Sequence, residues 1–389
     1  MMFLMIYLRN MKKMFSYPET KKKYSVSFLV PAWNEQDTIE NSIKDIENID
    51  YEINEIIVIN DKSSDKTPEI LKRLAKNYPN LRIINNEKNL GKAESLNRGL
   101  KFAKSELIAV VDADSYPVAD SIKKMVGFFD DEKVGVVTCP VLVRNRDKFI
   151  GKLQAIEYQI ISFSRKLLDY VDAIYVTPGP LALYRKRALE DVGGFDKRNM
   201  TEDIEVTWNL AHNRWRRRMC LSTGVFSTAP EKFRGWFRQR IRWNIGGLQC
   251  IYKYRKSLFK EGIFGWFIIP LFILSTFLGL VGLAIFSYLL TRRTISNFLY
   301  TKYSIVANTS LIVLEDFYIT PSILNYFGVI LFIFGLILTL IMLSILKEKV
   351  FVRENLLNIP FFMLIYLSFY PIIMLISIGD MIVGKRTWR

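Results

Sequence analysis

The chain has 389 residues, of which 50% are hydrophobic, enough for one sizeable soluble domain and a smaller second unit. Its 54 basic residues outnumber its 38 acidic residues and give a formal net charge of +16. No helix-turn-helix, zinc or RNA-binding signature accompanies this charge, so we expect no nucleic-acid partner.

The cysteines and the histidine exclude two further classes of site. Three widely spaced cysteines make neither a disulfide framework nor a zinc site, and they suit a reduced, cytosol-facing domain. His212 is the only histidine, which argues against a histidine-based metal site and a Ser-His-Asp triad. Acid–base chemistry in this chain would therefore fall to carboxylates.

The N-terminal segment is apolar over residues 1–8 and basic after them. Eight residues are too few to span a bilayer, and the order of charge and apolar residues is the reverse of a signal peptide. We predict that residues 1–24 form a basic arm on the membrane surface, with a disordered tail as the alternative.

Apolar strand-like runs then alternate with helical patterns. The predicted strands are 26–30, 55–59, 81–84 and 107–111, and the predicted helices between them are 37–49, 67–77 and 93–103. Continuous apolar strands alternating with helices indicate an α/β domain with a mostly parallel sheet. Asp61 and Asp112 lie just past the carboxyl ends of two strands, which is where such sheets bind ligands.

The second half of this domain continues to about residue 261. We predict a strand over 134–143, a long amphipathic helix over 151–170, and a segment at 174–184 that Pro178-Gly179-Pro180 interrupts. The predicted soluble domain covers residues 25–261, with helices at the membrane interface near 231–261.

Residues 262–389 are predicted to form a membrane region. The segments 264–290, 323–346 and 356–378 carry no charged side chain, and each is long enough to span a bilayer as a helix. Basic residues before the first span favour a cytoplasmic catalytic domain in a multi-pass protein of the cell membrane. Three spans would place the basic tail 385–389 outside, so two alternatives stay open: one segment lies in the interface, or part of 291–322 re-enters.

Three motifs follow one another before the membrane region. They are Asp112-Ala113-Asp114, Thr201-Glu202-Asp203 and Gln239-Arg240-Ile241-Arg242-Trp243. In this order they resemble the membrane-bound inverting nucleotide-sugar transferases of glycosyltransferase family 2, which include the hyaluronan, chitin, cellulose and poly-N-acetylglucosamine synthases. The resemblance covers roughly residues 25–260 by motif, and it implies a GT-A fold with a C-terminal helical membrane region.

The resemblance also implies a donor site. Its residues would be the first nucleotide loop (Pro31, Ala32, Glu35), the base-contacting Asp61, the diphosphate-contacting Lys92, and the metal–diphosphate motif Asp112, Ala113 and Asp114. Asp112 and Asp114 would hold Mg²⁺ or Mn²⁺ against the phosphates. The family usually has paired acids where this chain has Asn60 and Asp61. An ordinary turn is the alternative for Asp61, and a solvated charge is the alternative for Lys92.

The acceptor side is implied in the same way. Asp203, with Glu202 beside it, corresponds to the general base that deprotonates the acceptor hydroxyl. Gln239, Arg242 and Trp243 correspond to an acceptor and diphosphate site, and Gly179 lies in a loop similar to the one lining the acceptor path. The alternatives are a helix N-cap with a dipole-stabilised first turn at Thr201-Glu202-Asp203, and a membrane-interface belt at 239–243.

We therefore predict an inverting transferase that uses a nucleotide-diphospho-sugar, most simply a UDP-sugar, and extends a β-linked polysaccharide. The alternative is transfer of one sugar to a lipid acceptor such as a polyprenyl phosphate. A transporter or scaffold is the weakest reading, because it leaves Asp112, Asp114, Asp203 and Gln239 unexplained. These motifs do not specify the donor sugar.

Overall fold

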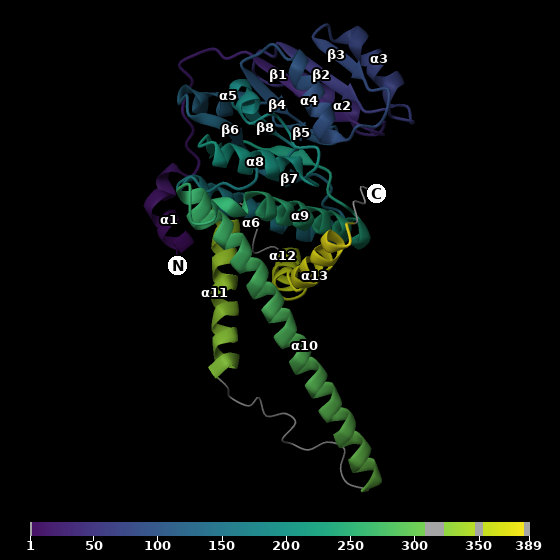
Figure 1. Cartoon of the computed structure of the whole chain (residues 1–389), viewed down its shortest axis with the longest axis vertical. Helices are drawn as coiled ribbons and strands as arrows, with labels where there is room; N and C mark the ends of the chain where they lie inside the picture. Colours follow the sequence, from purple (N-terminus) through teal and green to yellow (C-terminus); the bar gives the residue numbers. More distant parts are fainter. Residues whose placement is uncertain (1, 308–322, 347–352, 385–389) are drawn as a thin grey trace. The chain divides into compact units, whose positions relative to one another are not determined.

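The computed structural model describes residues 2–307, 323–346 and 353–384. The chain divides into two compact units, residues 1–272 with 377–389 and residues 273–376 (Figure 1).

The first unit contains a seven-stranded sheet in the order β3-β2-β1-β4-β8-β6-β9. Strands β1 (Val26–Ala32), β2 (Glu55–Asn60), β3 (Leu81–Asn85) and β4 (Leu107–Val110) are parallel to one another. Strand β8 (Ala182–Arg185) is antiparallel to β4 and to β6 (Val134–Thr138), and β9 (Arg216–Met219) is parallel to β6. The predicted mostly parallel α/β sheet is confirmed.

Helices cover both faces of this sheet because successive side chains of a strand point to opposite sides. Phe28 and Val30 of β1 pack in one core cluster with helices α2 (Ile39–Glu47) and α3 (Thr67–Asn77). Leu29 packs in the other cluster with α4 (Lys92–Phe102). Because β1, β2 and β4 are parallel, the loops that follow them meet at one edge of the sheet, where the predicted donor residues lie.

The predicted strand 134–143 is wrong as a single element. Strand β6 ends at Thr138, and after Cys139-Pro140 the chain forms β7 (Val141–Val143) in a different sheet. This second, three-stranded sheet joins β7 to β10 (Val225–Ser227) and β5 (Ser115–Pro117). Proline has no N–H to donate to a strand ladder, which suits a change of sheet at this point.

Several further helices belong to the first unit. The predicted amphipathic helix is present as α6 (Phe149–Asp169), and α8 (Glu202–His212) and α9 (Phe233–Tyr254) follow it. The N-terminal arm contains helix α1 (Met2–Asn10), whose Tyr7 ring lies 5.7 Å from the ring of Phe163 in α6. Two short helices, α5 (Ser121–Val126) and α7 (Lys186–Asp191), also belong to this unit.

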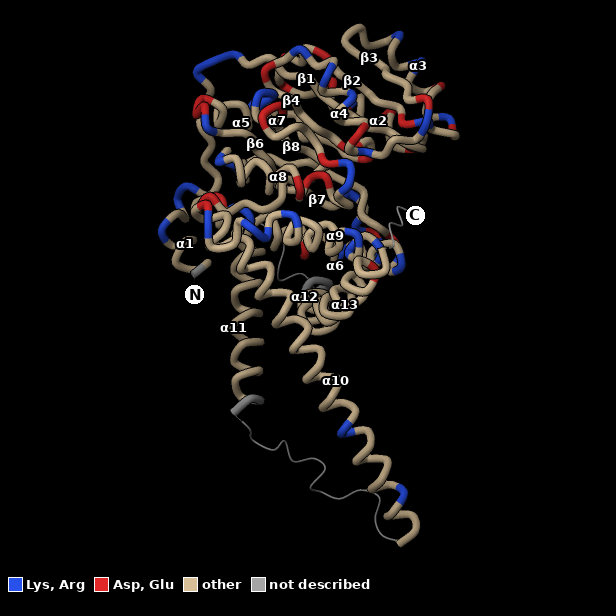
Figure 2. Tube along the Cα trace, viewed as in Figure 1, with Lys and Arg blue, Asp and Glu red and all other residues tan. Residues whose placement is uncertain are grey.

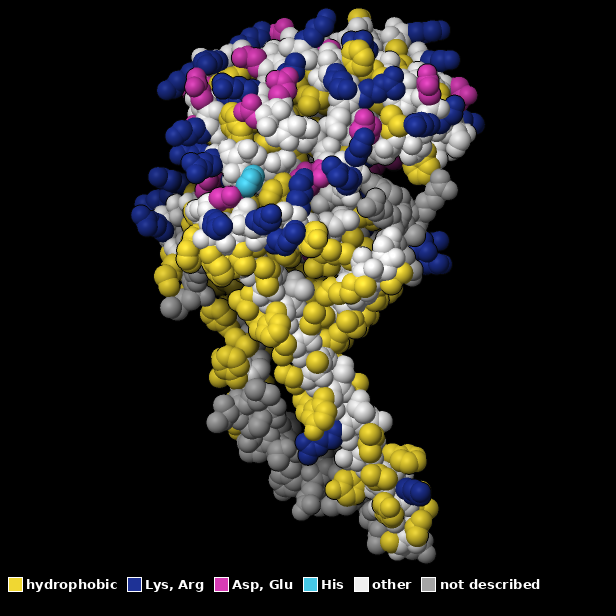
Figure 3. All heavy atoms as spheres, viewed as in Figure 1, with side chains coloured by type: hydrophobic (Ala, Val, Ile, Leu, Met, Phe, Trp, Pro, Cys, Tyr) yellow, Lys and Arg dark blue, Asp and Glu magenta, His cyan; other side chains and the backbone are white. Residues whose placement is uncertain are grey.

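Among the described residues, three helices are long and apolar enough to cross a membrane: 264–306, 326–345 and 356–382. Lys, Arg, Asp and Glu are frequent in the domain that holds the sheets and sparse along these helices, whose visible side chains are mainly hydrophobic (Figures 2 and 3). The first helix, a π-helical turn Phe264–Ile268 followed by α10 (Ile269–Val306), extends beyond the predicted end at 290.

The other two segments differ from one another in regularity. Helix α11 (Ile323–Ile345) matches the second predicted span. The third is not one regular helix, because a π-helical turn at Phe362–Tyr366 separates α12 (Arg353–Phe361) from α13 (Phe369–Ile382). The tail 385–389 and residues 308–322 of the predicted re-entrant region lie outside the described residues, whereas residues 291–306 of that region continue helix α10.

Candidate active site

The loop after β1 is joined to the loop after β2 by hydrogen bonds. Pro31 and Ala32 end β1, and Asn34 adopts a left-handed backbone conformation with φ of 58°. The backbone N–H of Ser64 donates to Asn34 Oδ1 at 2.8 Å, and that of Glu35 donates to Thr67 Oγ1 at 2.9 Å. These bonds hold Glu35 at the carboxyl edge of the sheet, where burial raises the pKa of its carboxyl group.

Asp61 is buried and organises the next loop. Its two carboxylate oxygens accept the backbone N–H groups of Leu90 and Gly91, both at 2.8 Å, and Asn86 Nδ2 donates to it at 2.7 Å. Gly91 has a φ of 83°, a conformation that L side chains rarely adopt. Asp61 and Gly91 together set the direction in which α4 begins, and therefore the position of Lys92.

Lys92 joins two of the acidic motifs. Its Nζ lies 2.6 Å from Asp112 Oδ1 and 2.7 Å from Glu202 Oε1. Burial works against the charged amine, but the carboxylates of Asp112, Glu202 and Asp203 outweigh it and raise the pKa of Lys92. A Cβ at Gly179 would lie 2.5 Å from this Nζ, so the glycine leaves the ion pair its space.

Asp112 and Asp114 suit a divalent cation. Asp114 Oδ1 accepts a hydrogen bond from Ser115 Oγ at 3.2 Å. Burial raises the pKa of Asp114 to about 7, and the nearby carboxylates of Asp112 and Glu35 add to this effect. No group of three or more candidate metal ligands occurs in the described ranges. A cation held by these two aspartates would thus share phosphate oxygens as ligands, as Mg²⁺ commonly does.

Glu202 and Asp203 begin helix α8 but have different surroundings. Burial would raise the pKa of Glu202, but its ion pair with Lys92 reverses the effect and the pKa is lowered. Burial raises the pKa of Asp203 to about 6, with the adjacent Glu202 charge adding to the shift. The two acids are therefore not equivalent: Glu202 is paired with Lys92, whereas Asp203 has a raised pKa of about 6 and could act as a base at neutral pH.

The start of α8 is also fixed from its other side. Thr201 occupies the N-cap position, but its hydroxyl donates to Asn199 Oδ1 at 3.2 Å and makes no bond to the helix. Thr207 donates to the backbone carbonyl of Asp203 at 2.6 Å and accepts the backbone N–H of Thr177 at 3.0 Å. The segment that leads to Gly179 is thereby attached to the helix that carries Asp203.

Helix α9 carries Gln239, Arg242 and Trp243, together with Arg240, which the sequence reasoning did not single out. Arg240 is 1% exposed, and its Nε donates to Glu157 Oε1 of α6 at 3.2 Å with a second contact from Nη2 to Oε2. Its guanidinium lies 4.0 Å from the ring centroid of Trp243, and it donates to Gln239 Oε1 at 2.6 Å. One face of Trp243 is thus occupied by Arg240, which fixes the ring.

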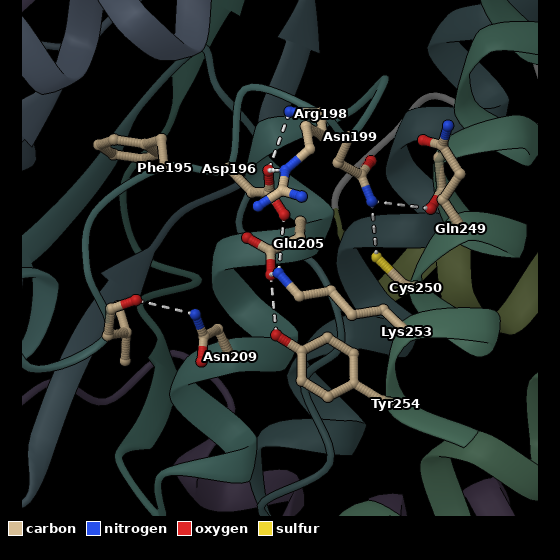
Figure 4. A network of polar contacts seen from close by, with 12 residues as sticks. Phe195, Asp196, Arg198, Asn199, Glu205, Asn209, Gln249, Cys250, Lys253 and Tyr254 are labelled. Atoms are coloured by element: carbon tan, nitrogen blue, oxygen red, sulfur yellow. Dashed lines mark hydrogen bonds and ion pairs between the residues drawn. The ribbon is translucent and has the colours of Figure 1, made fainter. Parts of the chain in front are cut away.

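A polar network joins α8 to α9 (Figure 4). The fully buried Glu205 accepts from Lys253 Nζ at 2.5 Å and from Tyr254 OH at 2.8 Å, and Lys253 also bonds Asp196 at 2.7 Å. Sequence reasoning did not identify these residues. Glu205 lies 48 positions before Lys253 in the chain, so their pairing leaves no local pattern in the sequence.

Close packing at Gly246 brings α9 against the start of α8. A Cβ at Gly246 would lie 1.8 Å from Thr201 Oγ1, whereas the nearest atom to a Cβ at Gly247 is 3.9 Å away in Phe272. Two consecutive glycines, Gly246 and Gly247, in a helical stretch are the sequence signal that could have indicated this close contact between α9 and the start of α8.

These neighbouring glycines provide a matched pair of substitutions. We expect Gly246→Ala to lower the free energy of unfolding by about 1–3 kcal/mol, because the methyl group must displace Thr201, and to lower transfer activity with it. Gly247→Ala should raise stability by up to about 1 kcal/mol, since alanine is the better helix former. Thermal unfolding of both variants checks this. Equal changes in the two variants would contradict the role given to Gly246.

Comparison with known proteins relates this arrangement to a family. The model of the family described as glycosyl transferase family 2 matches residues 27–193. The chain is 30% identical over 356 residues to a poly-beta-1,6-N-acetyl-D-glucosamine synthase of Staphylococcus epidermidis, covering 91% of this chain and 81% of that protein. The synthase of Staphylococcus aureus (strain MSSA476) is 34% identical over 251 residues, which cover 64% of this chain and 60% of that protein.

A solved structure shares the fold. It is the mannosyltransferase PcManGT from Pyrobaculum calidifontis in complex with GDP-Man and Mn²⁺, with a TM-score of 0.63 and 19% identity. The match covers 99% of this chain and 96% of that one. The GT-A-like α/β domain followed by apolar helices, predicted from the sequence, is confirmed.

Proposed function

Because the chain belongs to glycosyltransferase family 2, we propose that it transfers N-acetylglucosamine from a UDP-sugar donor, with inversion, to the end of a β-linked saccharide chain. The observation that carries the proposal is the pair of ion contacts from Lys92 to Asp112 and Glu202. These contacts support the proposal because they join the side chain of Asp112 to the start of helix α8, which carries Asp203. Similarity to polymer synthases over 91% of the chain supports the choice of product.

On the donor side, Pro31, Ala32, Glu35 and Asp61 belong to the loops that would border the nucleotide. The Lys92 amine would bind the diphosphate. Its ion pair with Glu202 keeps the amine protonated and holds it in position. Asp112 and Asp114, with Ala113 between them, would hold Mg²⁺ or Mn²⁺. That cation, when bound, neutralises the charge that develops on the leaving UDP.

On the acceptor side, Asp203 removes the proton of the attacking hydroxyl. The hydroxyl oxygen bonds to the anomeric carbon, the bond from that carbon to the diphosphate oxygen breaks, and the configuration inverts. Gln239 and Arg242 supply hydrogen-bond donors near the leaving diphosphate or the acceptor, and Trp243, whose ring is packed against Arg240, supplies an aromatic ring for the acceptor sugar. Gly179 keeps the acceptor path clear beside Lys92.

The proposed location is the cell membrane, with the catalytic domain facing the cytoplasm, where UDP-sugars are made. The three apolar helices supply the attachment. Basic residues near the first of them favour the cytoplasmic side and anionic lipid.

The pH dependence of kcat/KM should show the ionisation of Asp203. A base is active when deprotonated, and the pKa of Asp203 is raised to about 6. At saturating Mg²⁺, where the bound cation would keep Asp114 ionised, we therefore expect kcat/KM to be constant above about pH 7 and to fall about tenfold per pH unit below about pH 6. Glu202 has a lowered pKa and should stay ionised through this range. A profile without an acidic limb down to pH 5 would contradict the assignment of the base.

Trp243→Ala should affect two reactions differently: transfer of the sugar to the saccharide acceptor and hydrolysis of the donor by water. If the ring supports the terminal acceptor sugar, transfer falls, whereas hydrolysis of the donor by water falls less because water needs no platform. If Trp243 is a membrane-interface residue, both reactions fall together with thermal stability. The measurement is the ratio of transfer to hydrolysis by the purified protein, and an unchanged ratio rejects the acceptor role.

Product length tests the proposed function as a whole. The full-length protein in detergent or vesicles is given UDP-N-acetylglucosamine, Mg²⁺ and a short β-1,6-linked N-acetylglucosamine primer. A ladder of longer products is expected. One added sugar on a polyprenyl phosphate or glycolipid, with no ladder on the primer, would favour the lipid-acceptor alternative. If the protein released UDP from none of the common UDP-sugars, transferase activity would be refuted.

A further inference from the structure

Helix α6 contains a buried arginine whose charge the mechanism above does not use. Arg165 is 7% exposed. Within residues 2–307, 323–346 and 353–384, its guanidinium makes no ion pair, hydrogen bond or ring contact with another side chain or with the backbone.

The other deeply buried arginines of this domain are paired. Arg217, which is 3% exposed, donates to the backbone carbonyls of Ile174, Trp215 and Asp172 at 3.2, 3.0 and 2.6 Å. Arg240 is bonded to Glu157. Among the described residues, Arg165 therefore differs from Arg217 and Arg240 in having no bonded partner for its guanidinium.

An unpaired buried guanidinium is costly. Removing a cation from water loses hydration that only hydrogen-bonding oxygens replace. Burial accordingly lowers the pKa of Arg165, while Tyr175, Asp203 and Cys139 favour the charged form. Since arginine stays protonated in proteins, the side chain presents several unused donors in one plane.

The position of Arg165 relates it to the acceptor side of the site. It lies seven residues after Tyr158 on α6, which places the two side chains on the same face two turns apart. The Tyr158 ring is 6.5 Å from the ring of Trp243. At its own end of this face, Arg165 is near enough to Asp203 and Tyr175 for their charges to favour its protonated form. The backbone that follows Tyr175 is bonded through Thr177 to Thr207 of the base helix.

We propose that Arg165 is an acceptor-binding residue, whose guanidinium donates hydrogen bonds to hydroxyl or amide oxygens of the saccharide that Asp203 deprotonates. The face of α6 from Tyr158 to Arg165 then borders the acceptor between Trp243 and the base. A neutral saccharide rich in oxygen acceptors matches a cation with several donors. This inference rests on the proposed function and adds one acceptor-binding residue to it.

The test compares Arg165→Met with Arg217→Met in the full-length protein. Arg165→Met should raise the KM for a β-1,6-linked N-acetylglucosamine primer about tenfold or more, and lower the ratio of transfer to donor hydrolysis by a similar factor. Its Tm without primer should equal or exceed that of the unmodified protein, because replacing an unpaired buried charge by an apolar side chain removes a cost. Arg165→Lys should restore part of the primer affinity.

Arg217→Met is the matched control. It removes an arginine that has partners and lies outside the proposed machinery, so its Tm should fall while the KM for the primer in the folded protein stays the same. If Arg165→Met instead lowers the Tm and leaves the KM and the ratio unchanged, Arg165 is structural and the inference is wrong.

Direct binding separates this inference from the proposed function. Primer is titrated into Asp203→Asn protein in the presence of UDP, with and without Arg165→Met. Weaker binding in the double variant supports the inference, and equal binding overturns it. If the unmodified protein neither binds nor extends the primer, the proposed function itself fails.

Discussion

Asp203→Asn is expected to lower the rate of sugar transfer by a factor of about 10²–10⁴, the usual effect of losing a general base. The variant should still bind the UDP-sugar. Asparagine keeps the size of the side chain and can still accept the backbone N–H of Ile204, as Asp203 Oδ1 does at 2.9 Å. The helix start should therefore persist. Initial rates with primer and calorimetric titration with the nucleotide measure the two effects.

Glu202→Gln provides the comparison for Asp203→Asn. It removes the charge that pairs with Lys92 at 2.7 Å and should weaken donor binding, an effect not expected at Asp203. If Asp203→Asn weakens nucleotide affinity as much as Glu202→Gln does, Asp203 serves the donor site or the fold, and the base must be sought elsewhere.

Asp114→Asn and excess chelator should both eliminate transfer. The variant loses one of two carboxylates available to a cation at the diphosphate, and loss of one group that stabilises transition-state charge typically costs about 10²–10³ in rate. Its fold should be unaffected, because the Asp114 side chain bonds only to the adjacent Ser115 among the hydrogen bonds of the described residues. Rates are measured against Mg²⁺ and Mn²⁺ concentration, with circular dichroism as the check on folding.

A carboxylate outside the site gives the control for Asp114→Asn. Asp50 is exposed and paired with Lys123 at 2.7 Å, so Asp50→Asn should leave the metal dependence unchanged. Full activity of the unmodified protein in excess chelator would refute a metal-dependent mechanism.

Local patterns in the sequence determined the layered α/β fold, the apolar helices and the order of the motifs. Strands β1 to β4 are continuous apolar runs bounded by turn residues, so their positions follow from neighbouring side chains. Asp61 directly follows β2 and Asp112 lies two residues after β4, and parallel strands bring their carboxyl ends to one edge of the sheet. The roles of Asp112, Asp203 and Trp243 came from resemblance to a family, and they remain proposals.

Contacts between distant segments were decided only by the tertiary structure. Val134–Thr138 and Val141–Val143 read as one apolar run, yet they pair with different partners in two sheets. The different pKa values of Glu202 and Asp203 depend on Lys92, which lies 110 positions before Glu202 in the chain. Arg240 with Glu157, Glu205 with Lys253, and Gly246 against Thr201 likewise join separate helices. A sequence pattern reports the periodicity of one element, whereas ion pairs, burial and close approach depend on which elements are packed together.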